Sequence, residues 1–145
     1  MTGMAILQPV VVLLGWTMVM WVWMYATRIP AMKRANVDIG KLRGGTGADL
    51  KAIIPPQVQW KAENYNHLHE APTVFYAVAL VLAIIGHGDG TNVVIAWVYV
   101  GLRIAHSIVQ ATVNRVALRF ALFILSTLAL MALILHAAIP IFGLH

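Results

Sequence analysis

The chain of 145 residues contains no cysteine. This absence excludes disulfide bonds, thiolate metal sites and a cysteine nucleophile, and it leaves the redox compartment undetermined. Charged side chains are also scarce, at 10% of the sequence, whereas soluble domains usually contain about 25%. Hydrophobic residues make up 61%, and the mean hydropathy is +0.81. A soluble domain of this length could not bury so much apolar surface, so the composition predicts a membrane protein.

Several stretches of the sequence are long and apolar enough to cross a bilayer. A spanning helix needs about 20 mostly apolar residues, because the hydrocarbon core is about 30 Å thick. The expected helices cover residues 4–27, 64–85, 92–114 and 119–142. We therefore expect an all-α membrane protein, a single domain over residues 1–145 in which four transmembrane helices form a bundle. Residues 28–60 are expected to form one long loop, because they contain too few apolar residues for a second core.

The positive charges lie on one side of this expected topology. Seven of the ten Lys and Arg residues lie between Arg28 and Lys61, and Arg115 and Arg119 accompany the connection between the last two helices. The connection on the other side contains Asp89 and no Lys or Arg. The excess of positive charge in cytoplasmic loops therefore predicts that both termini face away from the cytoplasm. Because this orientation explains the basic residues, we expect no nucleic-acid binding.

Two of the expected helices carry polar stripes. The third has polar side chains at spacings of three, four and four residues: Arg103, His106, Gln110 and Asn114. The second has them at spacings of four and three residues: Glu63, His67 and Glu70. Such spacings place side chains on one helical face, and ionisable groups in a membrane are costly unless they face a polar interior. We expect the stripes to meet in a polar cavity near the basic side. Alternatively, Glu70 and Arg103 form a buried ion pair that only holds helices or subunits in register.

Other polar motifs predict no metal site and no phosphate-binding loop. His67 and His69 are two residues apart and cannot share a helical face, so a metal site made by both is not expected, although the spacing allows one made by His67 with Glu63 or Glu70. His136 stands alone on an apolar helix and is interpreted as a packing residue. The segment Gly44-Gly45-Thr46-Gly47 follows no strand and lacks the Gly-Lys-Ser/Thr of a phosphate-binding loop, which favours a flexible loop.

The two polar stripes also carry motifs of a known family. Residues 66–76, Asn-His-Leu-His-Glu-Ala-Pro-Thr-Val-Phe-Tyr, resemble the second-helix signature of the MAPEG family, the membrane-associated proteins of eicosanoid and glutathione metabolism. Residues 103–107, Arg-Ile-Ala-His-Ser, resemble the third-helix Arg-x-x-His-Ser/Thr element of microsomal glutathione transferases and many bacterial relatives. The four-helix layout, the long first loop and the length agree as well. The resemblance therefore covers essentially the whole chain.

The resemblance implies a homotrimer of four-helix bundles in the lipid bilayer. Glutathione would be the cofactor, held between neighbouring subunits near the cytoplasmic face, and a lipophilic substrate would enter from the bilayer. By the same resemblance, Glu70 would bind the glutathione amino group and Asn66 or His67 would supply a neighbouring polar contact. Arg103 would hold a carboxylate or pair with Glu70.

The third-helix stripe and the residues beyond it complete the site that the resemblance implies. His106 and Gln110 would line the cofactor site, and Arg115 or Arg119 would stabilise the thiolate. A nearby guanidinium favours the charged form of a thiol and so raises the concentration of the nucleophile.

The chain departs from the family pattern at identifiable positions. Glu63 stands where several eicosanoid-type members have Arg, and His67 stands where Asn is common. His106 and Gln110 stand where the leukotriene-type enzymes have tyrosines. The fold is therefore better supported than the activity, and leukotriene synthesis in particular is not supported.

These observations lead to competing functions. The first is a membrane-bound glutathione transferase or glutathione-dependent peroxidase that detoxifies lipophilic electrophiles, in a bacterial inner membrane with both termini periplasmic. The alternative is a non-catalytic membrane subunit or scaffold of a larger complex, in which the polar residues fix the oligomer. A small transporter or channel would also explain intramembrane charges, but no broken-helix or inverted-repeat signal accompanies them.

Overall fold

The computed structural model describes residues 4–35, 54–68, 70 and 72–144. The secondary structure of this part of the chain is entirely helical: α1 (Leu7–Arg34), α2 (Pro56–His67), α3 (Pro72–Ile84), α4 (Thr91–Ala111) and α5 (Val116–Ile141). Within it, four helical segments are long and apolar enough to cross a membrane, and α2 and α3 together form one of them. The expected all-helical fold with four spans is therefore confirmed.

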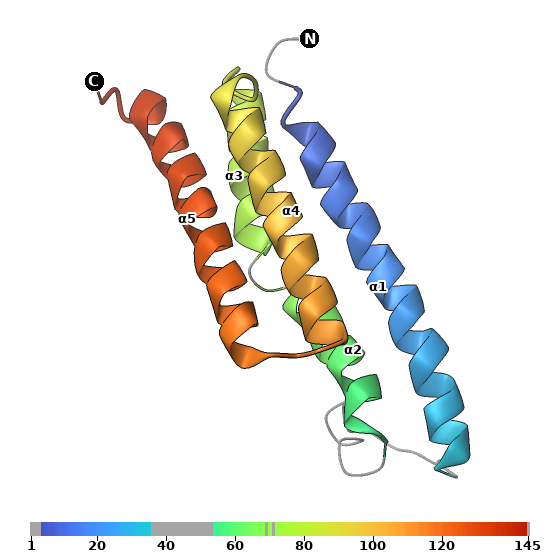
Figure 1. Ribbon diagram of the computed structural model, residues 1–145. Coiled ribbons are helices and arrows are strands. Elements are labelled where there is room, and N and C mark those ends of the chain that lie inside the picture. The colour runs from blue at the N-terminus through green and yellow to red at the C-terminus, as the bar shows by residue number, and fades with distance from the viewer. Residues whose placement is uncertain (1–3, 36–53, 69, 71, 145) are drawn as a thin grey trace.

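The bundle places its loops and helix ends in two groups (Figure 1). The start of α1, the turn between α3 and α4, and the end of α5 lie at one end of the bundle. The end of α1, the start of α2 and the α4–α5 connection lie at the other. Most of the described basic residues lie toward the second end, including Arg34 in the last turn of α1 and Arg115 just before α5.

α1 is longer than the sequence suggests, since it continues past residue 27 to Arg34. The expected end was placed at the first charge, Arg28. Basic side chains are nevertheless favourable in a last helical turn, where they face the partial negative charge of the unpaired carbonyls, and Lys33 and Arg34 occupy that turn. The first part of the expected loop is therefore helical, and residues 36–53, with the glycine-rich segment, lie outside the described residues.

The second expected helix is two helices joined by a short break. α2 begins at Pro56, eight residues before the expected start, because proline is well suited to a first helical position. It ends at His67, and α3 begins at Pro72. Pro72 has no N–H group to donate back into α2, which favours the start of a new helix at this residue. Thr73 instead donates to the Glu70 carbonyl through both its backbone N–H, at 3.3 Å, and its Oγ1, at 2.6 Å.

The remaining connections are short, as expected. Gly86 and Gly90 take positive φ values of +80° and +59° in the turn between α3 and α4, which glycine adopts at little cost. α4 ends at Ala111, three residues before the expected boundary, and Asn114 with φ +54° redirects the chain into α5. α4 and α5 then run antiparallel and side by side (Figure 1).

The core lies between α1, α3 and α4, and α5 packs on the outside. Most of the large, fully buried apolar side chains come from α1, α3 and α4, among them Leu13, Met20, Phe75, Leu82 and Tyr99. α5 contributes only three buried residues, Ser126, Leu133 and Ala137. Large apolar side chains such as Phe120, Leu128 and Leu135 are exposed along α5. An apolar exterior on helices that satisfy their own backbone hydrogen bonds suits a lipid environment.

Candidate functional site

The polar stripe of α4 is buried, as its spacing predicts. Arg103 is 1% exposed, His106 6% and Gln110 8%. Asn114 lies beyond the end of α4, where its Oδ1 accepts a hydrogen bond of 2.6 Å from Arg119 Nη1. Three of the four residues of the stripe therefore face the interior, and the fourth positions Arg119.

Ser107 connects three helices and was given no role in the sequence analysis. Its Oγ accepts hydrogen bonds from Trp16 Nε1 of α1, at 2.8 Å, and from Asn64 Nδ2 of α2, at 2.6 Å. Asn64 and Ser107 are completely buried. Ser107 lies one turn after Arg103, so extending the polar stripe to hydroxyl groups would have found it.

His67 of α2 and His106 of α4 stack on each other with ring centroids 5.0 Å apart and an interplanar angle of 27°. The His67 ring also lies 6.5 Å from the Phe123 ring of α5. The two polar stripes of the sequence therefore meet at these imidazoles.

Glu70 contacts His67 and not Arg103. Its Oε2 lies 3.7 Å from His67 Nδ1, a distance typical of an ion pair and longer than a hydrogen bond, and its side chain is 73% exposed. The ion pair between Glu70 and Arg103 that the sequence suggested is not formed. The reason is the helix break, because Glu70 lies in the turn between α2 and α3 and not on the inner face of a continuous helix.

Arg103 has no acidic partner in the part of the chain that the structure describes. Its Nε and Nη2 atoms are buried and make no hydrogen bond to the described residues. A buried guanidinium with free donors is costly in a membrane, so Arg103 is suited to binding an anionic group.

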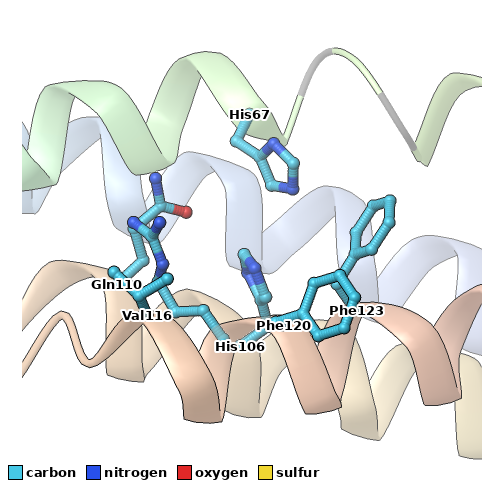
Figure 2. Close-up of a pocket in the computed structure, with 7 residues that line it drawn as sticks. His67, His106, Gln110, Val116, Phe120 and Phe123 are labelled. Atoms are coloured by element: carbon cyan, nitrogen blue, oxygen red, sulfur yellow. The ribbon is translucent and has the colours of Figure 1, made fainter.

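A cavity of about 310 Å³ adjoins the histidine stack between α2, α4 and α5 (Figure 2). Its lining combines four polar and three apolar side chains: His67, His106, Gln110, Arg119, Val116, Phe120 and Phe123. Figure 2 shows His67 directed from α2 toward His106, with Phe120 and Phe123 beside the two rings. This lining suits a molecule with a polar part that reaches the imidazole, amide and guanidinium groups and an apolar part against the phenylalanines.

The other predicted site residues lie away from this cavity. Asn66 is exposed on α2, in contrast to the buried Asn64. Arg115 precedes α5 and is exposed, whereas Arg119, one turn later, lines the cavity. The structure therefore separates the two arginines that the sequence left as equal candidates.

The two histidines considered for other roles are separate from the stack. His69 lies outside the described residues. His136 Nδ1 lies 2.6 Å from Asn92 Oδ1, and Asn92 Nδ2 donates to the His87 carbonyl at 2.8 Å. His136 thus joins α5 to the start of α4 at the opposite end of the bundle, which agrees with a packing role.

Comparison with known proteins gives one finding. The model of the MAPEG family matches residues 6–139, nearly the whole chain. No curated protein and no solved structure matches the chain significantly.

Proposed function

Because the chain belongs to the MAPEG family, we propose that this integral membrane protein is a glutathione transferase or glutathione-dependent peroxidase acting on lipophilic electrophiles. The observation that carries the proposal is the cavity beside the histidine stack, whose polar groups and phenylalanines share one space of about 310 Å³. A polar thiol and an apolar electrophile need such a mixed site in order to react together.

The charged groups fit the chemistry of glutathione, which carries two carboxylates, one ammonium group and one thiol. Arg119 lines the cavity, and Arg103 is buried on α4 one turn before His106, outside the cavity lining; both are cations suited to carboxylates or a thiolate. Glu70 presents an exposed carboxylate 3.7 Å from His67 Nδ1, and it is suited to the ammonium group. Gln110 Oε1 is buried without a partner among the described residues, so it is available as a hydrogen-bond acceptor. We propose that Glu70, His67, Arg103, His106 and Gln110 bind the cofactor.

Arg119 is our candidate for stabilising the thiolate. Its guanidinium lines the cavity and is held by the 2.6 Å hydrogen bond to Asn114 Oδ1. A fixed guanidinium beside a thiol favours the thiolate. Arg115 is exposed outside the cavity, so the proposal assigns it no part in the chemistry.

We further propose that the protein is a homotrimer in a bacterial inner membrane, with both termini periplasmic. The cavity lies beside the outward-facing residues Val116 and Phe120, which are 70% and 63% exposed. A neighbouring copy could cover this side and leave a lipophilic substrate a path from the bilayer. The basic end of the bundle, with Lys61 and Arg115, would face the cytoplasm.

Calorimetry with the detergent-purified protein tests the proposed function. Wild type should bind glutathione with saturation, whereas Glu70→Gln and Arg103→Ala should lose binding and keep the same oligomer size on gel filtration. Lys33→Gln is the control, because Lys33 is exposed in the last turn of α1 and does not line the cavity. Unchanged binding in both site variants would reject the proposal.

A non-catalytic subunit is the second candidate, and the exposure of Glu70 favours it. A carboxylate that is 73% exposed beside a membrane bundle is also suited to docking a cationic group of another subunit. Purification from native membranes with a stoichiometric partner, together with no thiol-dependent turnover, would support this candidate over the enzyme.

A further inference from the structure

His67 lies where the cavity meets the Glu70 carboxylate. Its ring lines the cavity and stacks on His106, with centroids 5.0 Å apart (Figure 2). On the other side, its Nδ1 lies 3.7 Å from Glu70 Oε2. One imidazole therefore contacts both a carboxylate and the space proposed for the thiol.

The carboxylate determines which ring nitrogen is free to accept a proton. The Glu70 carboxylate is too far from Nδ1 for a hydrogen bond, but its negative charge favours the tautomer with the proton on Nδ1. Nε2 then carries the lone pair; the atom is buried and makes no hydrogen bond to the residues that the structure describes. His67 thus has one unpaired ring nitrogen, Nε2, on a ring that contacts both His106 and Glu70.

We propose that His67 is the general base that takes the proton of the glutathione thiol, an inference that rests on the proposed function. The S–H bond breaks, the proton forms an N–H bond at Nε2, and the electron pair stays on sulfur. The imidazolium that results is stabilised by Glu70, and the thiolate shares the cavity with Arg119. The exposed part of the Glu70 carboxylate remains available for the ammonium group of glutathione.

The groups around His67 distinguish it from the other histidine of the stack. The negative charge of Glu70, in the turn after α2, favours a protonated His67, whereas the positive charges of Arg103 on α4 and Arg119 on α5 oppose it. His106 contacts the same cavity but has no carboxylate contact in the described part of the chain. The carboxylate partner therefore assigns the proton to His67 and not to His106.

A proton count on wild type tests this assignment directly. Calorimetric titration with glutathione in two buffers of different ionisation enthalpy measures protons released, and ultraviolet absorbance measures the thiolate formed. If His67 takes the proton, thiolate should appear near neutral pH with almost no proton released to the buffer. Release of one proton for every thiolate would overturn the inference, because the proton would then have gone to solvent.

Substitution gives an independent test with a matched control. His67→Gln keeps a polar side chain that cannot take up a proton. At saturating glutathione, which offsets the lost binding contact of His67, it should form thiolate only at higher pH and lose about 10²-fold in turnover. His136→Gln, at the opposite end of the bundle, should behave as wild type. Undiminished thiolate in His67→Gln at neutral pH would refute the inference, and His67→Asn serves as the second variant if Gln perturbs folding. If wild type binds no glutathione, the proposed function fails first, and the two failures are therefore distinguishable.

Discussion

Trp16 Nε1 donates a hydrogen bond of 2.8 Å to Ser107 Oγ, across 91 residues of sequence. The same oxygen accepts from Asn64 Nδ2 at 2.6 Å. Three helices therefore share one buried hydroxyl group, on the residue that follows His106 and one helical turn after Arg103. This network holds the helices that carry the candidate site.

Removing that hydroxyl group should destabilise the bundle. Ser107→Ala leaves the buried Asn64 amide and the partly buried Trp16 N–H without an acceptor, which we expect to cost about 1–3 kcal/mol of unfolding free energy. Ser126→Ala is the matched control, because Ser126 Oγ donates only to the Phe123 carbonyl of its own helix. The free energy of unfolding in mixed detergent micelles is measured for both variants and for wild type. If both variants lost the same unfolding free energy, the hydrogen bonds of Ser107 between helices would add nothing to stability.

Replacing the buried arginine should have opposite effects on stability and binding. Arg103→Met removes a buried charge that has no acidic partner among the described residues, so unliganded protein should be as stable as wild type or more stable, by up to about 4 kcal/mol. Glutathione binding should be lost. Thermal unfolding with and without glutathione checks both effects, and a large loss of stability without ligand would contradict the prediction.

The two arginines near the start of α5 should differ in catalysis. Arg119→Gln should reduce turnover by about 10²-fold, comparable to the loss of one group that stabilises a developing negative charge. Arg115→Gln should leave turnover close to wild type, because Arg115 is exposed outside the cavity. Steady-state rates with a lipophilic electrophile make the comparison. The reverse order would exchange the roles of the two residues.

Two glycines of α4 and its preceding turn should respond in opposite ways to alanine. Gly90 has φ +59° and ψ −131°, a conformation that strains other residues, so Gly90→Ala should cost about 1–3 kcal/mol. Gly101 lies within α4 and a Cβ there would meet nothing within 4 Å, so Gly101→Ala should stabilise by about 0.5–1 kcal/mol. Unfolding free energies measure both. Destabilisation by Gly101→Ala would indicate that another copy packs against this surface.

The absence of cysteine makes the orientation easy to test. Asp89→Cys and Arg115→Cys place single thiols at exposed positions on the two ends of the bundle. A membrane-impermeant maleimide added to intact cells should label position 89 without permeabilisation and position 115 only after it. The reverse pattern would invert the proposed orientation.

Local features made several elements predictable. Apolar length identified the four spans, and the spacing of Arg103, His106 and Gln110 identified a buried face, because a helix repeats every 3.6 residues whatever its partners. The end of α1 and the break before Pro72 were missed. Each depends on how the unpaired backbone N–H and C=O groups at a helix end find partners. A search for continuous apolar runs does not detect such local interactions.

The sequence by itself determined that the chain spans a membrane as a helical bundle, that its family motifs lie on the second and third spans, and that its basic residues gather at one end. These properties follow from composition and periodicity, which act along the chain. Only the tertiary structure decided that Glu70 contacts His67 and not Arg103, that Ser107 joins three helices, and that Arg119 and not Arg115 reaches the cavity. Each of these contacts depends on the rotation and depth of one helix against another, and spacing within a single helix carries no information about either.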